Sequence, residues 1–237
     1  MEYWKLIILF LSAFLGGISI FLFKQDNTQR LKLILSFSGA YLFAITVLHL
    51  IPEVYETGGN SVGLYVLGGF LLQIILEQFS EGIEHGHIHS HNHKRIVFPF
   101  GIMISLCFHA FLEGMPLAKG PQNELVFGIA LHHIPASFAL GSVLAQNKLK
   151  QNAIILLLAA FALMTPLGFL LSNGLSNGSV GDITGYFDGI MGIVIGIFLH
   201  ISTTILFESS VDHHFNFRKM AAVLLGLGIA LIGFFAH

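Results

Sequence analysis

The chain has 237 residues, of which 54% are hydrophobic and only 10% are charged. Its mean hydropathy is +0.79, and soluble domains carry about 25% charged residues, so the composition excludes an ordinary soluble domain. The formal net charge of −2 leaves no basic surface for phosphate groups, which excludes a nucleic-acid-binding protein.

The apolar residues form eight blocks, each long enough to cross a lipid bilayer. A bilayer core is crossed by about 20 helical residues. The sequence therefore predicts an all-α membrane protein with eight transmembrane helices in a single domain over residues 1–237. The first block has the length of a full span and no clean small-residue cleavage site, so we expect it to be retained. The predicted spans are residues 4–23, 33–54, 62–80, 97–117, 124–146, 152–172, 186–207 and 219–236.

The basic residues predict how the chain lies in the membrane. Nine of the eleven lysines and arginines lie in or beside the connections that follow spans one, three, five and seven. Connections rich in Lys and Arg face the cytoplasm. We therefore expect a multi-pass protein of the plasma (inner) membrane, with both termini outside.

The second block ends with His49 and Glu53, which flank Pro52 at the predicted external face. Residues four apart share one face of a helix. Two interpretations stay open for this pair. It is either an interfacial polar cluster at a helix end or a mouth through which a metal ion enters.

The connection after the third block, residues 81–95, holds five alternating histidines on the predicted cytoplasmic side. Clustered imidazoles bind zinc, nickel or copper weakly and adaptably, and a loop this short and polar does not fold alone. The sequence therefore predicts a metal-handling loop here, with an inert solvated tract as the alternative. The histidines are His85, His87, His89, His91 and His93.

The fourth and fifth blocks carry the strongest candidate site. His109 and Glu113 are four residues apart in the fourth block, and His132 and His133 lie in the fifth. Ionisable side chains inside a membrane are costly unless they bind something, and imidazoles with a carboxylate suit a divalent transition metal. We expect prolines, including Pro135, to bend or open both helices near the site.

The last blocks add two further candidates. His200 lies near the middle of the seventh block and is interpreted as a packing or pore-lining residue rather than a primary ligand. Glu208 ends the same block at the predicted cytoplasmic face, where it could receive a released cation. The eighth block has no ionisable residue in its interior and is interpreted as scaffold.

These motifs together resemble the ZIP family (the Zrt- and Irt-like proteins) of divalent metal transporters, over essentially the whole chain. HLIPE at 49–53, HAFLEG at 109–114 and HHIPAS at 132–137 look like the family's motifs in spans two, four and five. The eight spans, the external termini and the histidine-rich cytoplasmic loop also match the family plan.

The resemblance implies a transporter rather than an enzyme, with no prosthetic group. The expected activity is transport of Zn²⁺ into the cytoplasm by alternating access, with spans one, four, five and six moving against spans two, three, seven and eight. Fe²⁺, Mn²⁺, Co²⁺ and Cd²⁺ are compatible with the same donors. The lipid bilayer is an expected partner, and a homodimer is a family-level expectation.

The resemblance also implies which residues bind the ion. It carries over His109, Glu113 and His132 as ligands, with His133 as a substitute ligand. Ala110, Ala136 and Thr165 stand where relatives have polar residues. We therefore expect one metal ion per protomer, its coordination completed by water or by a backbone carbonyl near Pro135.

Two other functions fit part of the pattern. A metal-dependent intramembrane hydrolase could use three imidazoles as zinc ligands and Glu113 as general base, but hydrolysis does not explain the histidine tract. An exporter of the cation-diffusion type also has histidine-rich loops, but its paired ligands lie in different spans. The sequence favours the transporter over both.

Overall fold

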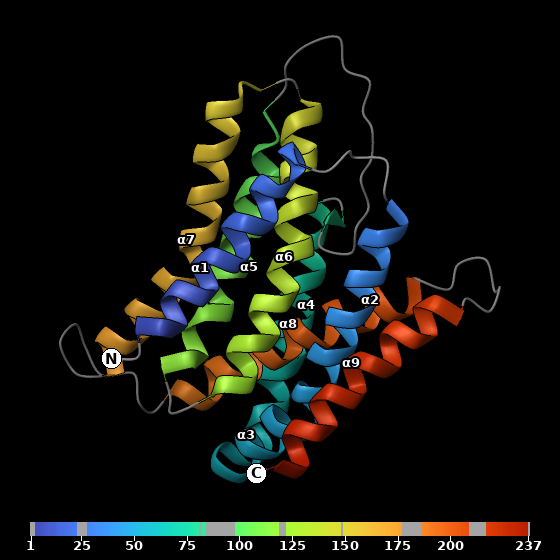
Figure 1. The fold of residues 1–237 in the computed structure, drawn as a ribbon. Coiled ribbons are helices and arrows are strands. Elements are labelled where there is room, and N and C mark those ends of the chain that lie inside the picture. The colour runs from blue at the N-terminus through green and yellow to red at the C-terminus, as the bar shows by residue number, and fades with distance from the viewer. Residues whose placement is uncertain are drawn as a thin grey trace.

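The computed structural model describes residues 3–22, 28–80, 82–83, 98–118, 122–147, 149–176, 186–208 and 217–236, and all regular secondary structure in these ranges is helical (Figure 1). The histidine tract at 85–93 lies outside them, so its predicted role stays a prediction. The helices are α1 (Tyr3–Ile18), α2 (Thr28–Ile45), α3 (Ile51–Gly58), α4 (Val62–Ser80), α5 (Phe100–Gly114), α6 (Asn123–Gln146), α7 (Gln151–Ser176), α8 (Phe187–Glu208) and α9 (Phe217–Ala236).

The predicted all-α membrane fold is confirmed, but the count of eight spans differs from what the structure has. In its described part, seven helical segments are long and apolar enough to cross a membrane. The difference lies in residues 29–80, an unbroken helical stretch of 52 residues. A straight helix of that length would measure about 78 Å, more than twice the thickness of a bilayer core.

This long stretch is built from two differently packed helices. α2 packs on α9, whereas α4 packs on α5. Between them, Gly59 has a φ of 63°, a left-handed value that glycine adopts without strain. The stretch therefore contains both predicted blocks 33–54 and 62–80, joined by helical turns where the sequence predicts a loop.

Two of the prolines lie inside continuous helices. α6 continues from Asn123 to Gln146 with Pro135 inside it, and α7 contains Pro166 in the same way. Helix geometry changes near two other prolines: α5 passes into a 3-10 turn, Met115–Ala118, that includes Pro116, and a π-helical turn, Thr46–Leu50, precedes Pro52. A proline removes one backbone hydrogen bond, and packing by neighbouring helices can keep the rest of the helix intact.

The helices pack in two groups. In the first, the α1/α5/α6/α7 group, α1 lies along α6 and α7, and α5 packs on α7. In the second, the α2/α4/α8/α9 group, α2 and α4 both pack on α8, and α9 packs on α2. One hydrophobic cluster is supplied almost wholly by the first group, with Ala13, Leu106, Leu140 and Leu158 among its members. The groups meet mainly where α2 contacts α6 and where α4 contacts α5.

Glycines bring α4 and α8 unusually close together. A Cβ atom at Gly69 would lie 1.9 Å from the carbonyl oxygen of Ile193, and one at Gly196 would lie 2.0 Å from that of Val66. Small residues permit such backbone approach between membrane helices. This contact holds the α2/α4/α8/α9 group together at its centre.

Candidate metal centre

Two of the predicted ligands lie one turn apart on α5. The His109 Nε2 atom is 3.1 Å from the Glu113 Oε1 atom. Both residues are buried, whereas Ile104 and Phe108 on the same helix are exposed. In a membrane protein, polar side chains face the interior of the bundle and apolar ones face lipid. α5 therefore presents its polar face to the rest of the protein.

α6 brings two imidazoles to the same place. The ligand atoms of His109, Glu113 and His132 all lie within 4.8 Å of one another, so one metal ion can reach all three. The His133 Nε2 atom is 2.6 Å from the Glu113 Oε2 atom. The carboxylate of Glu113 therefore has one oxygen facing His109 and the other facing His133.

The burial of these groups decides what chemistry they support. Glu113 and His132 are 0% exposed, and His133 is 1% exposed. Moving an ionised carboxylate out of water costs several kcal/mol unless a nearby charge compensates it. A divalent cation provides that compensation, and two imidazole nitrogens with a carboxylate oxygen are donors that Zn²⁺ and its first-row neighbours prefer. The residues present therefore fit such an ion.

α7 packs against the part of α5 that carries Glu113. A Cβ atom at Gly114 would lie 2.0 Å from the carbonyl oxygen of Thr165, and one at Gly168 would lie 2.0 Å from that of Phe111. The ring of Phe161, also on α7, has its centroid 5.8 Å from that of His133. Because α5 and α7 pack this closely, the turn that carries Glu113 has little freedom to shift.

The predicted pair His49 and Glu53 lies at a separate cavity. This cavity, which we call the outer pocket, has a volume of about 360 Å³ and lies between the end of α2 and the start of α6. Gln122 and Glu124 also line it. Neither residue stands out in the sequence, because nothing in their local spacing links them to a histidine more than seventy positions earlier.

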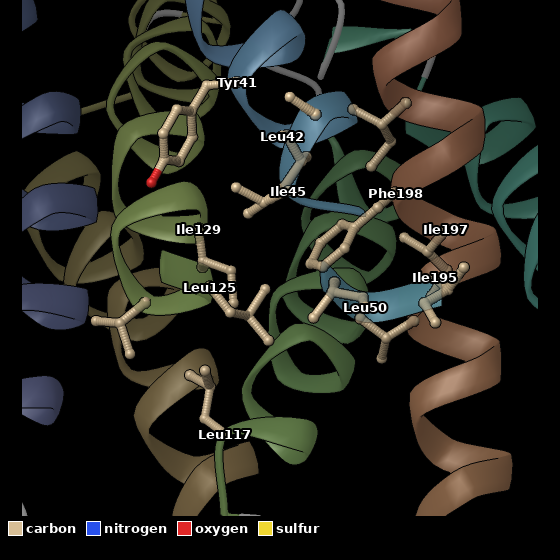
Figure 2. Packing of buried hydrophobic residues seen from close by; sticks show 14 of the residues in the cluster. Tyr41, Leu42, Ile45, Leu50, Leu117, Leu125, Ile129, Ile195, Ile197 and Phe198 are labelled. Atoms are coloured by element: carbon tan, nitrogen blue, oxygen red, sulfur yellow. The ribbon is translucent and has the colours of Figure 1, made fainter. Parts of the chain in front are cut away.

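An apolar layer separates the outer pocket from the buried site. Leu125 lines the pocket, Ile129 follows one turn later on the same face of α6, and His132 and His133 follow one turn after that. These leucine and isoleucine side chains are buried in a cluster that also includes residues of α2 and α8 (Figure 2). The layer consists of Ile45, Leu50, Leu125, Ile129 and Phe198.

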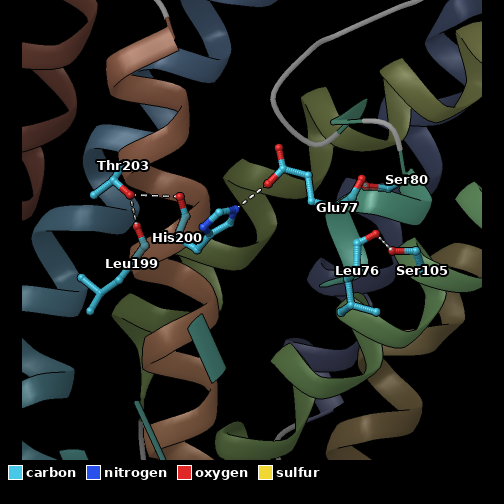
Figure 3. A network of polar contacts seen from close by, with 7 residues as sticks. All are labelled: Leu76, Glu77, Ser80, Ser105, Leu199, His200 and Thr203. Atoms are coloured by element: carbon cyan, nitrogen blue, oxygen red, sulfur yellow. Dashed lines mark hydrogen bonds and ion pairs between the residues drawn. The ribbon is translucent and has the colours of Figure 1, made fainter. Parts of the chain in front are cut away.

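The two candidates on α8 have different outcomes. The His200 Nε2 atom lies 2.5 Å from the Glu77 Oε2 atom of α4 (Figure 3). The side chain of His200 also packs edge-on against Phe70. His200 therefore has a carboxylate partner, Glu77, which the sequence did not predict. Glu208 is the last residue of α8, but its side chain lies outside the described part of the structure. Its predicted role in cation release stays a prediction.

Comparison with known proteins identifies the family. A family model described as "ZIP Zinc transporter" matches residues 85–236, more than half of the chain and a region that includes α5 and α6. The curated "Protein zntD" of Dictyostelium discoideum is 30% identical over 172 residues, a match that covers 63% of this chain and 24% of that protein. The chain thus spans about a quarter of the length of that relative. The family resemblance predicted from the motifs is confirmed: this chain belongs to the ZIP family.

Proposed function

We propose that this protein transports a divalent transition metal ion, with Zn²⁺ as the expected ion, across the membrane into the cytoplasm. The observation that carries the proposal is the convergence of His109, Glu113 and His132 at the centre of a bundle of apolar helices. The family is one of zinc transporters, which favours transport over the hydrolase and the exporter. The name of the matched relative, "Protein zntD", does not state a substrate.

In the proposed site, His109, Glu113 and His132 bind the ion directly. His133 hydrogen-bonds to the second carboxylate oxygen of Glu113 and so holds the carboxylate in place, since partners of metal ligands orient them. Whether His133 also enters the coordination shell, as the sequence predicts, stays a prediction. Water or a backbone carbonyl near Pro135 completes the coordination.

Alternating access is the proposed mechanism. We infer that the apolar layer closes the buried site off from the outer pocket, so that an ion passes when α6 moves relative to α2 and α8. The division of the helices into two packing groups supports a movement of the α1/α5/α6/α7 group against the α2/α4/α8/α9 group. In this scheme the ion approaches past His49 and Glu53 and leaves past Glu208.

The proposed orientation in the membrane rests on the charges of the connections. Nine of the eleven basic residues lie on the side that the positive-inside rule assigns to the cytoplasm. We therefore propose a plasma-membrane protein with external termini. The inward direction of transport and the homodimer are proposed from the family resemblance. Access of a membrane-impermeant reagent to tags at each terminus of intact cells would test the orientation.

The decisive experiment is uptake of radiolabelled Zn²⁺ into proteoliposomes. We expect saturable uptake by the unmodified protein and its loss in Glu113→Ala and in His132→Ala. Glu113→Gln keeps the shape of the side chain and removes its charge, so loss of uptake in this variant would assign the effect to the carboxylate. Glu56→Gln removes an exposed carboxylate of α3 instead, and should leave uptake unchanged.

Two results would overturn the proposal. One is bound metal without any uptake by well-folded unmodified protein. The other is undiminished uptake in Glu113→Ala, which would place the transport site elsewhere. Competition by Fe²⁺, Mn²⁺, Co²⁺ and Cd²⁺ would then rank the preferred ions.

A further inference from the structure

We propose that the outer pocket is a second cation-binding site, which takes a hydrated divalent transition metal ion before that ion reaches the buried site. The inference rests on the proposed transport function for its physiological role, but the binding itself does not. The groups that would bind the ion are His49, Glu53, Gln122 and Glu124.

Three buried polar atoms at the pocket have no hydrogen-bond partner among the described residues. Gln122 is only 8% exposed, and neither its amide oxygen nor its amide nitrogen has a hydrogen-bond partner among the described residues. The buried Nε2 atom of His49 has none in that part of the chain either. Buried polar groups are normally hydrogen-bonded, and each exception needs an explanation. A cation with its water shell would provide partners for all three atoms.

The charged residues that line the pocket favour a positively charged ligand. Glu53 and Glu124 contribute two carboxylates, and no lysine or arginine is among the described residues that line the pocket. The balance favours a cation over an anion. Because an imidazole lines the same cavity, a first-row transition metal fits it better than Ca²⁺ or Mg²⁺ does.

The backbone that carries His49 departs from regular α-helical geometry. Pro52 has no N–H, so it cannot donate to the carbonyl of Leu48 as the helix requires. The preceding turn is widened into a π-helix, Thr46–Leu50, in which the Ile51 N–H donates to the Thr46 carbonyl. Such π-turns occur frequently at functional sites. Here it lets His49 line the pocket, while the ring of Phe234 packs edge-on against it with centroids 5.3 Å apart.

The pocket is large enough for a hydrated ion and lies apart from the buried site. Its volume of about 360 Å³ holds an ion with six waters, since a water molecule occupies about 30 Å³ in the liquid. Leu125 at the pocket and His132 at the buried site are seven residues apart on α6, which corresponds to about 10 Å along the helix. With the apolar layer between them, the outer pocket cannot share its ion with the buried site. It is therefore a separate site.

The transport test separates the apparent affinity for metal from the maximal rate. An outer site that concentrates the ion raises its local concentration on the order of tenfold, so Glu53→Gln with Glu124→Gln should raise the KM for Zn²⁺ by about that factor. The maximal rate should stay within about twofold, because the buried site is intact. Glu56→Gln removes one carboxylate from the same exposed helix without touching the pocket, and its KM should not change.

The binding test does not depend on transport. The full chain with Glu113→Ala and His132→Ala, and with serine at the five histidines of 85–93, lacks the other proposed metal sites. Titration of this protein with Zn²⁺ should show one residual binding event per protomer. Adding Glu53→Gln and Glu124→Gln should abolish it, whereas adding Glu56→Gln should not.

The two tests distinguish a failure of this inference from a failure of the transport function. No residual binding, or residual binding that survives the loss of Glu53 and Glu124, overturns the outer site whatever the uptake shows. An unchanged KM in the paired glutamine variant likewise overturns its role in transport. If the unmodified protein takes up no metal, the binding titration alone still decides whether the outer site exists.

Discussion

Glu113 has one carboxylate oxygen 3.1 Å from the Nε2 atom of His109 and the other 2.6 Å from that of His133. Among the residues that the structure describes, only His109 and His132 converge with Glu113 tightly enough for one ion to reach all three. At the scale of residues, the two neighbouring histidines of α6 thus differ in role. In the proposed site His132 binds the ion, whereas His133 hydrogen-bonds to the carboxylate of Glu113.

This difference predicts unequal effects of the same substitution. His133→Gln keeps a donor near Glu113, and we expect it to weaken Zn²⁺ affinity by about 10- to 100-fold, the usual effect of losing a partner of a ligand. His132→Gln should remove measurable binding at the buried site. Calorimetric titration of the purified full chain, with serine at the histidines of 85–93, measures both.

A donor-free variant supplies the control for this prediction. His133→Leu should bind more weakly than His133→Gln if hydrogen bonding to Glu113 is what matters. Equal loss of binding in His132→Gln and His133→Gln would instead make His133 a direct ligand, as the sequence predicts.

At the scale of elements, the contact of α5 with α7 fixes the position of the buried site. A Cβ atom at Gly168 would meet the backbone oxygen of Phe111 at 2.0 Å, which leaves no room for a side chain. Backbone cannot rotate away as a flexible side chain can, so any substitution here must push the two helices apart. The site depends on this contact because Glu113 and Phe111 lie on the same short stretch of α5.

We therefore expect Gly168→Ala to destabilise the protein. Overpacking of a tight interior contact costs about 1–3 kcal/mol, so the thermal unfolding midpoint in detergent should fall. Gly228→Ala on α9 is the matched control, because a Cβ atom there would meet nothing within 4 Å. That variant should be neutral or slightly stabilising, since alanine is favoured over glycine in a helix. An unchanged midpoint in Gly168→Ala would show that α5 and α7 can separate at no cost.

At the scale of the whole molecule, the contact of α2 with α6 joins the two packing groups and contains the apolar layer. A Cβ atom at Gly128 of α6 would lie 2.5 Å from the Cδ1 atom of Ile45 of α2. By contrast, a Cβ atom at Gly17 of α1 would lie 2.7 Å from the Cδ2 atom of Leu158 of α7, and both of these helices belong to the α1/α5/α6/α7 group.

These two contacts predict which cross-link stops transport. In a Cys107→Ala background, a disulfide formed by Ile45→Cys and Gly128→Cys should abolish Zn²⁺ uptake, and a reducing agent should restore it. A disulfide formed by Gly17→Cys and Leu158→Cys joins helices that move together, so uptake should persist. Full uptake through the oxidised Ile45 and Gly128 pair would contradict the movement of one group against the other.

The sequence by itself determined the class of the protein and the half-sites within each helix. Hydropathy is a property of consecutive residues, so the apolar blocks follow from the chain alone, as does the helical membrane fold. The spacing of His109 and Glu113 is also local, because residues four apart meet on any α-helix. The motifs sufficed for the family, which the comparisons confirm.

Only the tertiary structure decided which side chains from different helices meet. The pairing of His200 with Glu77, and the gathering of His49 with Gln122 and Glu124, depend on how distant helices pack. No local spacing encodes such packing. The same reason explains why α6 stays helical through Pro135, since packing by neighbouring helices can keep a helix continuous where a proline removes one backbone hydrogen bond.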